Sequence, residues 1–176
     1  MNENKRLDAP DDARTRTVTW QDPFITARLL GPETGLGLLQ RMIAGKLPSP
    51  PIAQLLDFRL VEVELGKAVF EFEPAEYHYN PIGVVHGGVA GILLDSAMGC
   101  SVHSTLSAGM GYTTLEFKVN LVRAITMNTG TMRIEGTLVH GGKRAATAEG
   151  RVIDRDGKIY AHGSTTCMIF PMNAKE

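Results

Sequence analysis

The chain has 176 residues, of which 43% are hydrophobic and 21% are charged, and its formal net charge is −1. This composition is typical of one globular domain that buries its own core. The near-neutral charge argues against an overall basic surface for nucleic acid. Every long apolar run is interrupted by Asp, Gly, Pro or His well before it reaches the length of a membrane span, so we expect no membrane segment.

The start of the chain, "MNENKRLDAPDDARTRT", is charged and has no apolar stretch, so we expect no secretory signal. The two cysteines, Cys100 and Cys167, follow no metal-ligand or redox spacing. Reduced, mostly buried thiols in a cytoplasmic protein are the expected state.

The N-terminal part of the chain is expected to lie outside the main domain. Residues 1–22 mix Asp, Arg, Thr and Pro without periodicity and predict a mobile tail. The segment 23–50 is predicted to hold an accessory helix, which the "LPSPP" run then ends. Four apolar side chains recur there at helical spacing, namely Leu36, Leu39, Met42 and Ile43. The main domain is assigned to residues 51–171, and residues 172–176 to a C-terminal tail.

The main domain reads as two strands, one long helix and four strands. "FRLVEVELG" and "KAVFEFEP" predict two strands joined by a turn at Gly66, and a helix follows from about Gly87 to Ser104. In "TTLEFKVNLV", the residues Leu115, Phe117, Val119 and Leu121 alternate with polar ones, as in a half-buried strand. Three further strands are predicted over residues 131–140, 145–153 and 158–169, with hairpin turns at "HGGKR" and "DRDGK". This order favours an α+β fold with an antiparallel sheet and the helix on one face.

The predicted long helix carries a carboxylate, Asp95, in the middle of an apolar run. Gly88, Gly91, Asp95 and Gly99 fall on one stripe of this helix. Glycine inside a helix costs about 0.5–1 kcal/mol relative to alanine, so something must approach this face closely. One interpretation is a narrow slot lined by a working carboxylate. The other is tight packing of helix on sheet, with Asp95 paired to a buried polar partner.

The helix begins with "HGG", where the first backbone N–H groups lack intrahelical partners and the helix dipole is positive. A thioester or ester carbonyl placed there could accept those hydrogen bonds, and it would accept them more strongly as an oxyanion develops. The two glycines, Gly87 and Gly88, leave room for this approach, although they also suit a packing or turn role. His86 is equally open to a structural hydrogen-bonding role.

Taken together, "NPIGVVHGG" and "VAGILLDSAMG" resemble the signature segment of hotdog-fold acyl-CoA thioesterases of the PaaI-like, phenylacetate-pathway type. The resemblance spans roughly residues 51–171 and includes the order of the strands. It implies a curved antiparallel sheet wrapped around one long central helix. It also implies a homodimer, often a dimer of dimers, with active sites at the dimer interface.

The resemblance assigns roles residue by residue. Asn80 resembles the asparagine that positions the thioester carbonyl or a water, and Gly87 resembles the backbone N–H donor to that carbonyl. Asp95, reaching from the partner chain, resembles the general base or nucleophile, and the choice between the two stays open. Thr113, in preference to Thr114, matches a residue that orients water, and His86 matches a histidine that supports the Asn80 loop.

Coenzyme A is expected only as part of the substrate, with no retained cofactor and no metal. The acyl group is expected to be an aryl group or a short to medium chain, in an apolar pocket. Arg123, Lys143 and Arg144 are candidates for binding the CoA phosphates, with ordinary surface charge as the alternative. The full set of candidate substrate-binding residues is Gly88, Val85, Met98, Tyr79, Thr114, Arg123, Lys143 and Arg144.

Two other functions stay open on the same fold. Hotdog hydratases and dehydratases use a histidine as base, usually with an acidic residue across the site, which His86 and Asp95 match less well. A non-catalytic acyl-CoA sensor is the second, although the chain shows no DNA-binding helix-turn-helix and retains Asp95. Turnover separates catalysis from binding, and the product separates hydrolysis from hydration.

Overall fold

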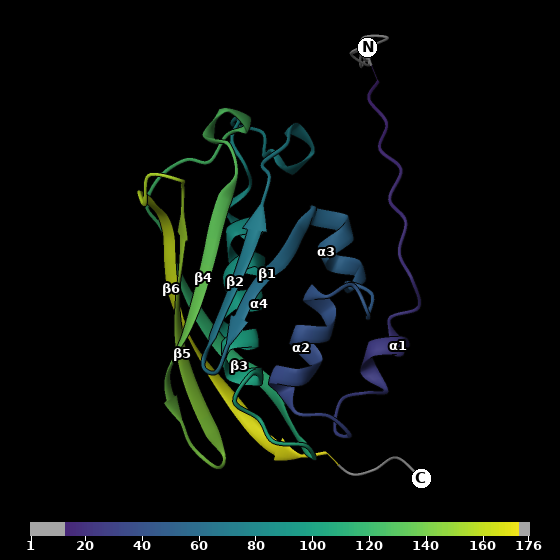
Figure 1. Ribbon diagram of the computed structural model, residues 1–176. Helices are drawn as coiled ribbons and strands as arrows, with labels where there is room; N and C mark the ends of the chain where they lie inside the picture. Colours follow the sequence, from purple (N-terminus) through teal and green to yellow (C-terminus); the bar gives the residue numbers. More distant parts are fainter. Residues whose placement is uncertain (1–12, 173–176) are drawn as a thin grey trace, which may run out of the picture.

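The computed structural model describes residues 13–172, which form one curved antiparallel sheet around a long helix (Figure 1). The strand order is β1-β2-β4-β5-β6-β3, so β3 and β1 are the two edge strands. This confirms the predicted α+β fold and the order of two strands, one helix and four strands. The strands are β1 (Phe58–Glu64), β2 (Lys67–Phe72), β3 (Met110–Leu121), β4 (Met132–Gly141), β5 (Ala145–Ile153) and β6 (Ile159–Pro171).

The long helix α4 (Gly87–His103) lies where the sequence predicts it, one residue shorter than expected. Its side chains Leu93, Leu94 and Met98 are fully buried against the sheet, which makes the helix the centre of the core. Glycine in the facing strand allows this close packing, because a Cβ on Gly136 of β4 would overlap the backbone at Ala97. No helix in residues 13–172 is both long enough and apolar enough to cross a membrane.

Three helices precede the sheet, and only one of them was predicted. Helix α2 (Gly35–Ile43) is the expected accessory helix, and it packs on β1 and α4. Helices α1 (Phe24–Ala27) and α3 (Pro51–Leu56) were not predicted. The proline run ends α2 as expected, but Pro51 then occupies the first turn of α3, where its fixed φ is favourable and its missing N–H costs nothing.

Only residues 13–22 of the predicted N-terminal tail belong to the described part of the chain. Its first part, residues 1–12, and the predicted C-terminal tail after Met172 lie outside them. Residues 13–22 contain no helix or strand, yet Arg16 holds this part on the domain. Its guanidinium donates to the Leu55 carbonyl at 2.6 Å and to the Gln54 carbonyl at 3.1 Å, and it lies 4.0 Å above the Tyr77 ring.

Two short 3-10 helices, η1 (Glu76–His78) and η2 (Met127–Thr129), stand in the loops at one end of the sheet. The buried His78 ring fixes the first of these loops. Its Nδ1 accepts from the Ala75 N–H at 3.0 Å, and its Nε2 lies 3.1 Å from the Leu56 carbonyl oxygen. The loop from η1 to α4 carries Asn80 and His86, so this end of the sheet holds half of the predicted site.

Candidate active site

The glycine stripe of α4 faces the edge strand β3. Gly87, Gly91, Asp95 and Gly99 follow each other at every fourth position, and Leu121, Phe117, Thr114 and Tyr112 of β3 lie opposite them in that order. A Cβ on Gly99 would lie only 2.7 Å from the Tyr112 hydroxyl oxygen. Within one chain, the close approach to this face is therefore tight packing of helix on strand. Gly88, which was predicted on the stripe, is instead exposed beside His86.

A β-bulge brings these β3 side chains to the same face. The pairing of β3 with β6 shifts register between Thr114 and Glu116, so the side-chain alternation changes phase there. Tyr112 and Thr114 before the shift and Phe117 after it can then all face α4. The sequence pattern predicted one unbroken alternation from Leu115 onward, but Leu115 is 59% exposed.

Asp95 is half-buried and has one hydrogen-bond donor among the described residues. Its Oδ1 accepts from the Thr114 hydroxyl at 3.0 Å. Thr113, the residue preferred from the sequence, is exposed and lies on the opposite side of the pleat, so within one chain Thr114 is the threonine that contacts Asp95. The water-orienting role expected of Thr113 stays a prediction. The bond fixes the carboxylate while leaving Oδ2 without a partner in residues 13–172, which suits a group that acts on substrate or water.

Asp95 is the only carboxyl group among the described residues that line a cavity of about 240 Å³. Helices α2 and α3 and strand β1 form one wall, mostly with apolar side chains but also with Arg59 of β1, and α4 and β3 form the other. Burial raises the pKa of the Cys100 thiol to about 12, with a smaller contribution from the Asp95 charge. The pKa of the Tyr112 hydroxyl is also raised well above its usual value, mainly by burial. Both groups are therefore neutral near pH 7.

The Asn80 loop lines a separate cavity, of about 300 Å³, at the start of α4. The Asn80 side-chain oxygen accepts from the backbone N–H groups of Ile82 at 3.1 Å and Val84 at 3.3 Å, so it holds its own loop. No described residue accepts a hydrogen bond from its side-chain NH₂, which leaves that donor for a ligand.

His86 caps the start of α4. Its Nδ1 accepts from the Gly88 N–H at 2.9 Å, and its backbone N–H donates to the His78 carbonyl at 2.8 Å. His86 thus joins the start of α4 to η1, and its expected role in supporting the Asn80 loop stays a prediction. The Gly87 N–H makes no hydrogen bond to any group in residues 13–172, so Gly87 rather than Gly88 offers the free donor at the positive end of the helix.

One chain does not bring Asp95 and this loop together. Gly87, where the loop joins α4, and Asp95 are eight residues apart, which corresponds to about 12 Å along the helix axis. The two cavities have no lining residue in common. The expected site residues thus form two separate halves, one around Asp95 and Thr114 and one around Asn80, His86 and Gly87.

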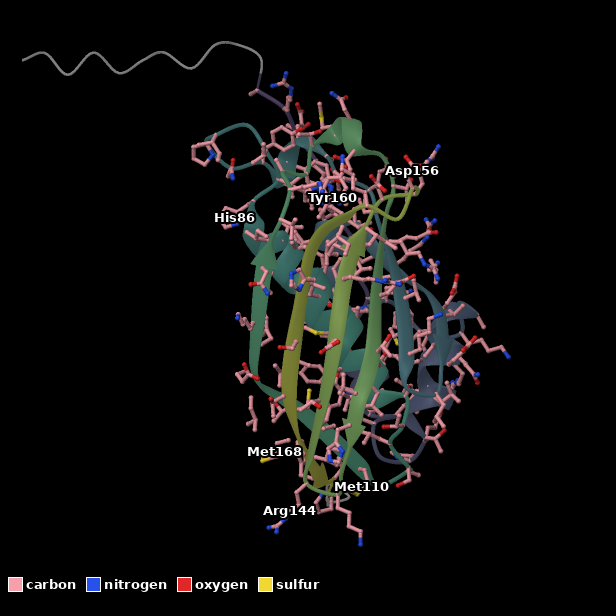
Figure 2. The ribbon with its side chains drawn as sticks, turned by 90° about the vertical axis from the view of Figure 1, so that its left-hand side faces the viewer. His86, Met110, Arg144, Asp156, Tyr160 and Met168 are labelled. Carbon is pink, nitrogen blue, oxygen red and sulfur yellow. The ribbon has the colours of Figure 1, made fainter. Side chains whose placement is uncertain are left out.

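The other expected binding residues are distributed between these regions. Val85 and Arg123 line the cavity of the Asn80 loop, and the Tyr79 hydroxyl accepts from the Met127 N–H at 2.9 Å beside it. Met98 is fully buried against the sheet and lines neither cavity, so its substrate-binding role has no support within one chain and stays a prediction. Lys143 and Arg144 lie in the β4–β5 hairpin, and Figure 2 shows Arg144 at the end of the sheet opposite His86.

The sequence interpretation missed the wall that the N-terminal helices give to the Asp95 cavity. Leu39 and Met42 of α2 and Ala53 of α3 line it, together with Cys100 and Tyr112. Nothing in the spacing of the N-terminal residues indicated this contact. His103, eight residues after Asp95, was also missed, although its position on the same helical stripe was a usable signal.

Comparison with known proteins agrees with this fold. Residues 82–161 match the family model described as the thioesterase superfamily. A protein of Saccharolobus solfataricus named as an esterase is 31% identical over 110 residues, which cover 62% of this chain and 76% of that protein. The 1,4-dihydroxy-2-naphthoyl-CoA hydrolase of Listeria monocytogenes is 25% identical over 118 residues, covering 67% of this chain and 94% of the hydrolase.

Among solved structures, a phenylacetic acid degradation-related protein of Ralstonia eutropha JMP134 superimposes with a TM-score of 0.67 at 28% identity. The match covers 74% of this chain and 98% of that one. Since the fold and the sequence matches agree, the chain belongs to the thioesterase superfamily and is a thioester hydrolase of the hotdog fold.

Proposed function

We propose that the protein hydrolyses acyl-CoA thioesters at sites shared by two protomers. Asp95 of one protomer and the Asn80–Gly87 loop of its partner form each site. The observation that carries this proposal is the separation of the two halves within one chain, because neither half alone supplies both a carboxylate and a free carbonyl-binding donor.

The edge strand β3 supports the shared site. Within residues 13–172 it pairs only with β6, and its apolar side chains Leu115, Phe117 and Leu121 are 59%, 45% and 60% exposed. An open edge with exposed apolar side chains favours pairing with a second copy. A two-fold axis near Phe117 would place the Leu121 end of one β3 beside the Thr114 end of the other. Because Leu121 lies over Gly87 and Thr114 binds Asp95, this pairing would join the two halves twice per dimer.

In this site the thioester carbonyl accepts from the Gly87 N–H, with the Asn80 NH₂ as a second donor. The developing oxyanion is stabilised there by the positive end of α4. Asp95 then acts in one of two ways. As a base it takes a proton from water, whose oxygen attacks the carbonyl carbon while the C–S bond breaks and CoA leaves as thiolate. As a nucleophile its oxygen attacks first, CoA leaves, and water opens the mixed anhydride.

A single turnover in ¹⁸O-labelled water distinguishes the two routes. The base route places the label in the acid product during the first turnover. If water opens the anhydride at the Asp95 carbonyl, the nucleophile route gives an acid whose new oxygen comes from the Asp95 carboxylate, and the label then appears in Asp95 itself. Unlabelled acid in the first turnover therefore identifies this route, whereas opening at the acyl carbonyl gives the same labelling as the base route. Mass spectrometry of the product and of the Asp95 peptide reads both outcomes.

The β4–β5 hairpin is the proposed contact for the CoA phosphates. The Arg144 carbonyl accepts from the Ile169 N–H at 3.0 Å, and the neighbouring Met168 pairs with Thr113. Lys143 and Arg144 therefore stand at the Thr114 end of β3, which the proposed pairing would bring near the partner's Asn80 loop. Replacing both by Ala should raise KM for an acyl-CoA and leave KM unchanged for an N-acetylcysteamine thioester, which lacks phosphates.

The substrate is proposed to be an aryl- or short- to medium-chain acyl-CoA. The apolar walls of the Asp95 cavity and its volume of about 240 Å³ support a small apolar acyl group. The Listeria relative, named as the hydrolase of an aryl-CoA, supports the CoA ester.

The test is a panel of phenylacetyl-, benzoyl-, hexanoyl- and crotonyl-CoA with wild type and Asp95→Ala. Free thiol and acyl product are both measured, and a folded variant of unchanged oligomeric state is required. We expect thiol release by wild type and a loss of about a hundredfold or more in Asp95→Ala. Hydration of crotonyl-CoA without thiol release would identify a hydratase instead. Binding without any product would identify a sensor.

A further inference from the structure

A second cavity, of about 330 Å³, adjoins the one at Asp95. The two cavities share the lining residues Met42, Ser49, Pro50 and Tyr112, so they lie next to each other across these residues. The other walls of the second cavity come mainly from the N-terminal segment and α4. They are the residues Pro23, Thr26, Leu30, Leu38, Pro48 and His103. No charged residue in the described part of the chain lines this cavity.

His103 is the one imidazole in this apolar lining. It ends α4, two steps of four residues after Asp95, so the two side chains stand on the same stripe about 12 Å apart along the axis. Its exposed fraction is 7%, and neither Nδ1 nor Nε2 has a hydrogen-bond partner among residues 13–172. Buried polar groups are nearly always paired, so this ring calls for a ligand or a bound water.

The surroundings hold the ring in place beside the cavity. The Tyr112 ring lies 5.6 Å from it between centroids. Gly35, at the start of α2, packs so closely on the His103 carbonyl that a Cβ there would overlap it. Burial lowers the pKa of the imidazole, so it is neutral near pH 7. A neutral imidazole offers one N–H donor and one nitrogen acceptor.

We infer that the second cavity receives the far end of the acyl group and that His103 hydrogen-bonds a hydroxyl group there. This inference rests on the proposed function. The preferred substrates are then thioesters of medium-chain ω-hydroxy acids, with the thioester at Asp95, the methylene chain passing Tyr112 and the terminal hydroxyl at His103. A hydroxyl matches the ring because it both donates and accepts.

Other terminal groups fit less well. A terminal carboxylate would enter an apolar cavity whose described lining supplies no Lys or Arg, which is costly. A terminal methyl group would leave the ring unpaired. A site built to hydrogen-bond a substrate hydroxyl discriminates strongly against the analogue that lacks it.

The test compares ω-hydroxyacyl-CoAs with the unsubstituted acyl-CoAs of equal length, from hexanoyl to dodecanoyl, by kcat/KM for thiol release. For wild type we expect a preference of about tenfold for the hydroxylated member at the length that reaches His103, and none at shorter lengths. His103→Leu should abolish the preference by slowing the hydroxylated member. His103→Gln, which keeps a donor and an acceptor, should retain part of it. His162→Leu, on an exposed histidine of β6, is the matched control and should keep the full preference.

The outcomes separate this inference from the proposed function. If wild type releases thiol from no member of either series and from neither phenylacetyl- nor benzoyl-CoA, the proposed function fails; if it cleaves only these aryl-CoAs, thioester hydrolysis stands and the role of His103 is overturned. If it cleaves both members of each pair equally, thioester hydrolysis stands and the role of His103 is overturned, with a buried water as the partner of the ring. The role of His103 is likewise overturned if His103→Leu keeps the preference for the hydroxylated member. Should His103→Leu not fold, the wild-type pairs and His103→Gln still decide.

Discussion

Replacing Thr114 by Val tests whether the bond to Asp95 matters for hydrolysis. Valine keeps the branched shape and removes only the hydroxyl that donates to Asp95 Oδ1 at 3.0 Å. A hydrogen bond to a charged group contributes about 1.5–3 kcal/mol, which corresponds to a decrease of about ten- to a hundredfold in kcat. KM should change little, because the acyl walls and the CoA contacts remain intact. Thiol release under saturating acyl-CoA measures the effect.

The neighbouring residue provides the matched control. Thr113 lies on the opposite side of the β3 pleat and is exposed, so Thr113→Val should leave kcat within about twofold of wild type. Melting temperatures of both variants establish that the fold is retained. An unchanged kcat in Thr114→Val, or an equal loss in Thr113→Val, would refute the assignment of Thr114 as the residue that positions Asp95.

Three further predictions concern stability and assembly. Gly136→Ala should destabilise the fold by about 3 kcal/mol, since the added Cβ would overlap the Ala97 backbone, and calorimetry should show a melting temperature lower by about 6–12 °C. Leu115→Lys on the open edge of β3 should give a folded monomer in light scattering and remove activity; an active monomer would contradict the shared site. Burial lowers the pKa of His78 and His103 from 6.5, so the unfolded chain binds protons that the fold does not, and stability should fall as the pH decreases below about 6.5. His103→Leu should reduce that slope.

The sequence predicted the fold well where one local pattern decides it. The apolar run with no interrupting proline predicted α4, and the alternation with two turn signals predicted the β4–β5–β6 meander. The order of strands in the sheet could not follow in the same way. β3 comes directly after the helix in sequence but pairs with β6 at the far edge, because α4 crosses the sheet before the chain returns. Proline misled at α3, where Pro51 begins a helix rather than prolonging the break.

The site was predictable as a set of residue types but not as an arrangement. Asp95 stood out because a carboxylate in an apolar helix needs a polar partner or a cavity. In the structure it has both, since it accepts from the Thr114 hydroxyl and lines a cavity. The contact of Asp95 with Thr114 could not be predicted, because the bulge just after Thr114 sets which side chains face the helix, and no local pattern marks a bulge. The wall from α2 depends on long-range packing, which no motif encodes.

Subunit complementation tests the shared site most directly. Asp95→Asn and Asn80→Ala are purified separately, unfolded together in denaturant, refolded and assayed for acyl-CoA hydrolysis. Each variant alone should be nearly inactive, whereas the equal mixture should recover about one quarter of the wild-type rate. Half of the randomly formed dimers are mixed, and one of the two sites in each mixed dimer contains both intact residues. A mixture that stays as inactive as its two components would contradict a site built from Asp95 of one protomer and the Asn80 loop of the other.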